Sequence, residues 1–269
     1  MRKKFGFISL LVVTLLSCVL IAAGKRTPTL FMVGDSTMAD KTELDISPER
    51  GWGQVFPTYL KENVRVENHA MNGRSTKSFV DEGRWDSVLV RMHRGDVLIL
   101  QFGHNDAKYT DPKRYSSPEQ YEANLRRMIR QAQERGVQVV VCTPICRRQF
   151  NAQGELEMTH GRYPAAAKRA AAGAGVPLLD METVTAQWLR ELGDQESKKY
   201  FMNVKPGECK KFPEGKVDDT HLREAGALAV GAMVVEQLKA QNVRFLTRYL
   251  REQPAEQAVY TTFCRPNFK

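Results

Sequence analysis

Short apolar runs alternate with amphipathic segments along most of this chain. Mostly apolar runs occupy residues 29–33, 96–101, 137–142 and 176–181, and residues 64–68 alternate between apolar and polar side chains. Runs of this length, bounded by glycine and polar residues, are typical of buried β-strands. The pattern therefore predicts a strand at each of these places.

Helical patterns fill the segments between the predicted strands. The clearest one begins at Ser117, a good N-cap, with Pro118 at the first helical position, and it ends at Gly136. Its apolar stripe, which predicts the buried face, consists of Tyr121, Leu125, Met128 and Ile129. Weaker patterns predict helices in the second half of residues 51–60, in part of residues 79–92, and at residues 164–174, 183–192 and 223–240. The polar, glycine-containing stretches between the later elements predict long loops at residues 143–163 and 198–217.

Strands that alternate with helices predict an α/β fold, with a mostly parallel sheet covered by helices on both faces. The chain has 269 residues and a hydrophobic content of 42%, which suits one large domain with a full core. We expect this domain to span residues 25–241. Residues 242–269 form a C-terminal extension beyond the pattern, and the sequence leaves open whether they pack as an extra helix or as a covering tail.

The first residues are typical of a targeting segment. Three basic residues, Arg2, Lys3 and Lys4, precede an apolar run from residue 5 to residue 23. This arrangement predicts a secretory signal peptide over residues 1–24, or an uncleaved anchor. Residues 21–23 offer a small-residue cleavage site, whereas residues 15–18 resemble a bacterial lipoprotein box in which Cys18 carries the lipid. Either alternative predicts an exported domain that is periplasmic, secreted or lipid-anchored to the outer membrane.

The formal net charge is +9, and it falls to +6 when the three basic residues of the first segment are set aside. A basic surface favours polyanionic partners. Export makes nucleic acid an unsuitable partner, so we expect an acidic polysaccharide or a membrane surface. The alternative is a solvated basic surface without an assigned partner.

Four cysteines follow the targeting segment: Cys142, Cys146, Cys209 and Cys264. In an oxidising compartment they allow up to two disulfides, and the sequence does not choose among the three pairings. Cys142 falls inside an apolar strand pattern, which also fits a buried thiol. Their spacing does not suggest a zinc site.

A serine follows the first predicted strand. Gly34 lets the backbone turn sharply there, and Ser36 comes two residues later. The carboxyl ends of parallel strands share one edge of the sheet, where ligands bind. Ser36 at that edge is either a nucleophile or the N-cap of a helix. A nucleophilic serine needs a base, for which His221 is the candidate, and Asp218 lies three residues earlier as the partner of its imidazole.

An ester hydrolase also needs donors for the oxyanion of its tetrahedral intermediate. The candidates are the backbone N–H groups of Ser36 and Gly73 and the side-chain amide of Asn105. Two acids that flank these positions, Asp35 and Asp106, are expected to brace the loops.

The chain resembles the SGNH, or GDSL-type, hydrolases. Ser36, Gly73, Asn105 and His221 match, in order, the four signature residues of that family, and the resemblance covers roughly residues 27 to 241. The usual leucine after the serine is Thr37 here. The resemblance implies a three-layer α/β/α fold and catalysis without a metal or another cofactor.

Within that family, the chain is most similar to rhamnogalacturonan acetylesterases. The similar stretches are residues 33–38, 51–53, 72–76, 102–106 and 218–221. This resemblance implies hydrolysis of O-acetyl esters on pectin, with Arg74 and His104 as candidate substrate-binding residues. Other cations on predicted site-edge loops are candidates to meet galacturonate carboxylates: Lys77, Lys108, Arg147, Arg148, Lys205, Lys210 and Lys211.

Three alternatives to this function stay open at this point. An acetylxylan esterase would have the same chemistry on a different polymer. A lysophospholipase or thioesterase would need an apolar channel for an acyl chain, whereas the predicted loops are polar and basic. A non-catalytic polysaccharide-binding protein would have no use for the full set of signature residues.

Overall fold

A computed structural model describes residues 27–251 of the chain. The predicted targeting segment, with Cys18, lies outside the described residues, as does Cys264. The core of the fold is a five-stranded sheet in which neighbouring strands are parallel and follow the spatial order β2-β1-β3-β4-β5. The strands are β1 Thr29–Gly34, β2 Arg65–Asn68, β3 Val97–Gln101, β4 Gln138–Cys142 and β5 Leu178–Leu179.

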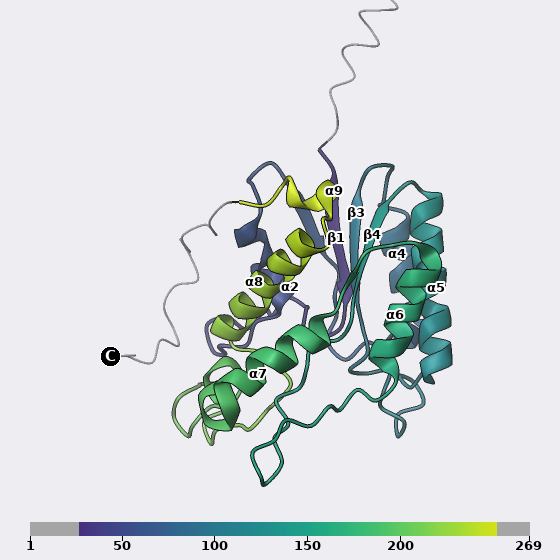
Figure 1. The fold of residues 1–269 in the computed structure, drawn as a ribbon. Helices are drawn as coiled ribbons and strands as arrows, with labels where there is room; N and C mark the ends of the chain where they lie inside the picture. Colours follow the sequence, from purple (N-terminus) through teal and green to yellow (C-terminus); the bar gives the residue numbers. More distant parts are fainter. Residues whose placement is uncertain (1–26, 252–269) are drawn as a thin grey trace, which may run out of the picture.

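Helices cover both faces of the sheet, so the three-layer arrangement is confirmed (Figure 1). One face carries α2 Trp52–Val55, η1 Phe56–Tyr59, α7 Met181–Ser197, η2 Lys198–Tyr200, α8 Glu224–Ala240 and α9 Arg244–Thr247. The other carries α3 Thr76–Asp81, α4 Arg84–Leu89, α5 Pro118–Glu134 and α6 Tyr163–Ala174.

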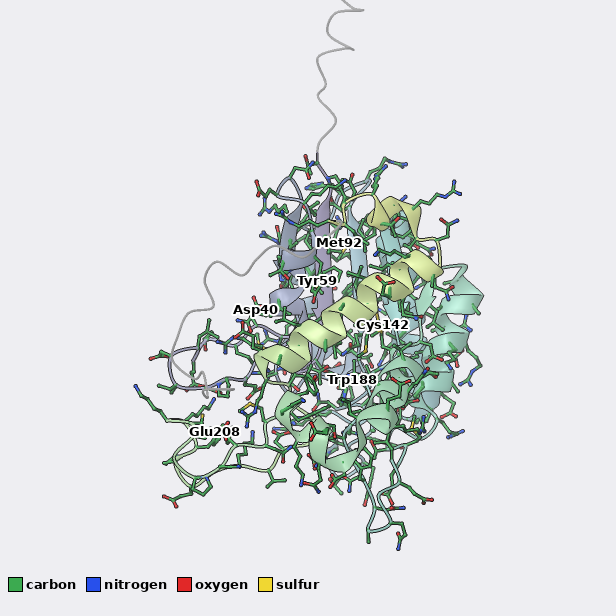
Figure 2. All side chains as sticks on the ribbon, turned by 60° about the vertical axis from the view of Figure 1, so that its left-hand side comes forward. Asp40, Tyr59, Met92, Cys142, Trp188 and Glu208 are labelled. Atoms are coloured by element: carbon green, nitrogen blue, oxygen red, sulfur yellow. The ribbon has the colours of Figure 1, made fainter. Side chains whose placement is uncertain are left out.

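Alternation of side chains along each strand divides the core into two layers. Leu30 and Met32 of β1 pack in the layer under α8, whereas Phe31 and Val33 pack in the layer under α5. Tyr59, labelled in Figure 2, lies behind α8, and its hydroxyl donates to the carbonyl oxygen of Leu228 at 2.7 Å. Both faces of the sheet are therefore buried, which explains why residues 30–33 of β1 and 97–100 of β3 are all apolar.

The predicted start of α5 is confirmed in detail. The Ser117 side chain accepts from the N–H of Gln120, and the Gln120 side chain accepts from the N–H of Ser117, which together form a capping box. The predicted apolar stripe is the buried face of this helix. Local residues alone thus specify where α5 begins and which side it buries.

The end of the sheet differs from the prediction. The strand expected at residues 176–181 pairs with β4 only at Leu178 and Leu179, and α7 begins directly at Met181. Pro177 has no N–H to donate to the ladder, and Thr143 accepts from the N–H of Glu182, which holds the first turn of α7. The helix also runs past the expected residue 192, with a non-helical Gly193 at φ 72°.

The C-terminal extension begins by packing on the domain. Leu246 and Leu250 lie in the same core layer as α8, and the N–H of Lys61 donates to the carbonyl oxygen of Tyr249 at 2.8 Å. The described part of the extension is therefore a covering segment with one short helix.

The described cysteines are free thiols. Cys142, Cys146 and Cys209 are all buried, and Cys142 lies inside the molecule in Figure 2. Burial raises the pKa of the Cys146 thiol to about 12. The sequence allowed up to two disulfides, and the structure shows none among the described cysteines, whereas the buried thiol at Cys142 is confirmed. Among residues 27–251, no helix has the length and apolar character that a membrane span requires.

Candidate active site

The polar loops predicted to share one edge of the sheet do so. The chain enters β1 at the top of Figure 1, so the carboxyl ends of the parallel strands point to the lower edge. Loops after β1, β2 and β3 carry Ser36, Gly73 and Asn105, and the loop before α8 carries His221. This edge is the ligand-binding edge of an open α/β sheet.

Ser36, His221 and Asp218 form one continuous hydrogen-bonded relay. The Oγ of Ser36 lies 2.9 Å from Nε2 of His221, and Nδ1 of His221 lies 2.8 Å from Oδ2 of Asp218. The other oxygen of Asp218 accepts from the backbone N–H groups of Thr220 and His221, each at 3.0 Å. The tight turn of residues 218–221 thus folds the carboxylate back onto its own imidazole.

The carboxylate of Asp218 is held in its ionised form. Burial raises its pKa, but hydrogen bonds from His221 and from Lys216 outweigh burial and hold the pKa well below the usual range. The Nζ of Lys216 lies 2.7 Å from Oδ2 of Asp218. A charged carboxylate can orient the imidazole and stabilise an imidazolium ion. Lys216 has no motif around it, so sequence reasoning missed this contact.

The three predicted oxyanion donors lie on the loops beside Ser36. Within the described residues, the N–H groups of Ser36 and Gly73 donate to no protein acceptor. Gly73 has a φ of +75°, a conformation that favours glycine. Asn105 has two amide protons, and one donates to the carbonyl oxygen of Arg74 at 3.0 Å. That contact orients the amide and leaves its second proton for an oxyanion.

Lys41 joins the turn of Ser36 to the loop that precedes Gly73. Its ammonium donates to the carbonyl oxygen of Ser36 at 2.7 Å and to Oδ1 of Asn72 at 2.6 Å. Its third contact is Oε1 of Glu49, at 3.0 Å. An ammonium has three protons, so these acceptors use all of them. Lys41 therefore fixes the spacing between two site loops, which no local pattern predicted.

The two predicted substrate-binding side chains make other contacts. His104 is 3% exposed, and its Nδ1 lies 3.1 Å from Oδ2 of Asp35, so it supports the turn of Ser36 from behind. Burial lowers the pKa of His104, although Asp35 opposes the shift. The Nε of Arg74 pairs with Glu82 at 3.0 Å, and only the backbone carbonyl of Arg74 reaches Asn105.

The expected bracing acids do hold the loops. Oδ1 of Asp35 accepts from the N–H and hydroxyl of Thr37 at 3.0 and 2.8 Å. Asp106 accepts from the N–H of Thr76 at 3.1 Å and from its hydroxyl at 2.5 Å, which ties the third loop to the start of α3. Among the described residues, no group of three or more histidine, cysteine or acidic side chains is arranged to hold a metal.

A buried hydrogen-bond chain continues beneath the turn of Ser36. The indole N–H of Trp52 donates to Oε1 of Gln101 at 2.7 Å, and Nε2 of Gln101 donates to the hydroxyl of Thr37 at 2.7 Å. All three side chains are buried. Buried polar groups that lose a partner are costly, so Gln101 is the central member of this support.

We expect Gln101→Met to lower the free energy of unfolding by about 2 kcal/mol, because it leaves the indole N–H of Trp52 buried without an acceptor. Denaturant unfolding measures this difference. Gln131→Met is the matched control, since Gln131 accepts from Trp85 at 2.7 Å at a partly exposed position where water can replace it. Equal losses in the two variants would contradict the prediction.

This fold and relay define a serine-dependent hydrolase of carboxylic esters. The chain belongs to the GDSL-like lipase/acylhydrolase family, which matches residues 32–229. The expected family is therefore confirmed, as is the expectation that the protein is an enzyme.

Two relatives and one solved structure show how far the similarity extends. The chain is 39% identical over 212 residues to the rhamnogalacturonan acetylesterase RhgT of Bacillus subtilis, which covers 79% of this chain and 90% of the relative. It is 31% identical over 225 residues to the probable rhamnogalacturonan acetylesterase YesY of the same organism, with coverage of 83% and 98%. The crystal structure of B. subtilis YxiM superposes with a TM-score of 0.69 at 27% identity, over 81% of this chain and 57% of that one.

Proposed function

We propose that this protein is a serine esterase that removes O-acetyl groups from rhamnogalacturonan. The observation that carries the proposal is the hydrogen-bonded relay of Ser36, His221 and Asp218. The polymer is inferred from the relatives, since RhgT is named a rhamnogalacturonan acetylesterase and YesY a probable one.

The proposed reaction has two steps. Ser36 Oγ attacks the acetyl carbonyl carbon while His221 Nε2 takes the hydroxyl proton, and the oxyanion accepts from the donors of Ser36, Gly73 and Asn105. The intermediate collapses as His221 returns the proton to the departing sugar oxygen. Water, deprotonated by His221, then attacks the acetyl-serine, and acetate leaves with the serine restored.

Asn105→Ala is expected to lower kcat by about a hundred- to a thousand-fold, the usual loss for one oxyanion donor. KM should change little, because the lost hydrogen bond forms mainly in the transition state. Steady-state kinetics with 4-nitrophenyl acetate measures both constants. An unchanged kcat would remove Asn105 from the oxyanion site.

Alternative ester substrates are tested by a screen for acetate release. We expect release from acetylated rhamnogalacturonan to exceed release from acetylated xylan and mannan. Preference for xylan would assign an acetylxylan esterase, and preference for long-chain acyl esters would assign a lipolytic enzyme. The lipolytic reading is disfavoured because polar and charged side chains, among them Lys41, Asn72 and Lys216, surround Ser36 and His221.

We also propose that residues 1–24 direct export and that Cys18 is the site of lipid attachment if the segment is a lipoprotein signal. Fractionation of cells that express the full chain tests export. Loss of membrane association in a Cys18→Ser variant would assign the lipid, unchanged membrane association would assign an uncleaved anchor, and a wild-type protein found only in the soluble fraction would assign a cleaved signal peptide.

A further inference from the structure

Three cations gather on the oxyanion side of the site. The guanidinium of Arg114 lies against Gly73: a Cβ on this glycine would stand 3.6 Å from both Cζ and Nη1 of Arg114. Lys108 is three residues beyond Asn105, and its N–H donates to the carbonyl oxygen of Asn105 at 3.2 Å. Arg147 reaches the same loop, with Nη2 donating to the carbonyl oxygen of His104 at 3.1 Å.

These cations have few anionic partners. The second contact of Arg147 is the hydroxyl of Thr159 at 2.9 Å, and its guanidinium forms no ion pair with a carboxylate of the described residues. Lys108 is exposed, and its ammonium forms no hydrogen bond or ion pair within residues 27–251. Arg114 pairs through Nε with Asp111 at 3.0 Å, which leaves its two terminal nitrogens.

Their charges act on one another. Partial removal of the ammonium from water lowers the pKa of Lys108, although the residue as a whole is exposed, and the neighbouring charges of Arg114 and Arg147 lower it further. Asp35 favours the charged forms of Lys108 and Arg147 from a longer distance, and Glu182 does so for Arg147. Those two acids already contact His104 and His160, so Asp111 is the one carboxylate in direct contact with this cluster among the described residues.

Several other cations around the site are paired with carboxylates, unlike Lys108 and Arg147. Arg148, expected at the rim, is buried and binds Asp194 and Asp219. Lys216 pairs with Asp218, and Lys211 pairs with Glu43. Arg223 pairs with Glu208, which lies on the outer loop after η2 (Figure 2).

We propose that Lys108, Arg114 and Arg147 form a subsite for the carboxylate of a uronic acid residue that neighbours the acetylated sugar. The guanidinium groups offer planar pairs of N–H donors that match a carboxylate, and the ammonium adds an adjustable charge. Their place beside Gly73 and Asn105 puts the carboxylate on the oxyanion side of the ester. This inference rests on the proposed function and names the part of an acidic polymer that the enzyme holds.

The test compares three acetate esters with the double variant Lys108→Gln/Arg114→Gln. The esters are an acetylated rhamnogalacturonan oligosaccharide, the same oligosaccharide with its carboxylates methyl-esterified, and 4-nitrophenyl acetate. We expect KM for the acidic oligosaccharide to rise at least about tenfold, which corresponds to about 1.4 kcal/mol, with kcat unchanged. KM for the two neutral esters should stay constant. Arg147→Gln should show the same selectivity for the acidic ester.

The control is Arg130→Gln/Lys239→Gln, which removes the same charge from exposed positions on α5 and α8. A rise in KM equal to that of the control would overturn the subsite and leave the esterase intact. Loss of activity on all three esters would also overturn it, since the cations would then act through the oxyanion loop. If the wild-type enzyme cleaved only the aryl ester, the proposed function itself would fail.

Discussion

Replacement of Ser36 by alanine lowers kcat by about a million-fold, the scale of loss when a serine hydrolase loses its nucleophile. The reason is that Ser36 Oγ is the atom that His221 Nε2 contacts at 2.9 Å, and no other hydroxyl takes its place in the relay. The substitution leaves the rest of the site that contacts the ester in place, so KM should change much less. Acetate release and hydrolysis of 4-nitrophenyl acetate both measure the effect.

The same variant should fold like the wild-type protein. Ser36 Oγ contacts only the partly buried His221, whereas the turn is held by Asp35, Thr37 and Lys41. Thermal unfolding should therefore occur within about 2 °C of wild type, since the substitution removes one hydroxyl and one side-chain hydrogen bond and leaves the contacts of the turn in place. Wild-type turnover in a variant of verified mass would refute the role of Ser36.

Asp218→Asn is expected to lower kcat by about ten thousand-fold, the loss that follows when an amide replaces the triad carboxylate. In the wild-type protein, Oδ2 of Asp218 accepts from Nδ1 of His221 and from the ammonium of Lys216. An amide nitrogen at that position would repel both donors and favour the imidazole tautomer that cannot accept the proton of Ser36. Kinetics with the aryl acetate tests this.

The neighbouring Asp219 provides a control for Asp218→Asn. Its Oδ1 binds Arg148 and Asn203 at 2.6 and 2.9 Å and takes no part in the relay. Asp219→Asn should therefore lower stability and leave kcat within a few-fold of wild type. Similar losses of kcat in both variants would mean that Asp218 acts by holding its loop.

Much of the fold follows from local patterns. β3 is predictable because the strand is buried on both faces, which favours the apolar run of residues 97–100. The start of α5 is predictable because its capping box lies within four residues. The boundary between β5 and α7 at Met181 was not predictable from the sequence. The mostly apolar residues 176–181 would look the same whether they paired as a strand or whether the contact with Thr143 set the start of the helix.

The residues of the site also fall into those that the sequence predicts and those that it does not. Ser36, Gly73, Asn105 and His221 were predictable because parallel topology brings loop ends to one edge. The burial of His104 was not predictable, because nothing in the polar residues around it indicates that its imidazole contacts Asp35. Arg114 was missed for a related reason. Its contact with Gly73 depends on the path of an irregular loop, and such a loop has no hydrophobic periodicity from which its path could be predicted.

The triple contact of Lys41 has a consequence for the course of turnover. Because its ammonium already joins the turn of Ser36 to the loop of Asn72, these two parts of the site need no closing motion before acylation. Loop closure and opening limit kcat in many enzymes and slow down as the solvent thickens. The rate of acylation is then governed by bond making and breaking, so acylation by a sugar acetate should be insensitive to solvent viscosity and should follow the basicity of the alcohol that leaves.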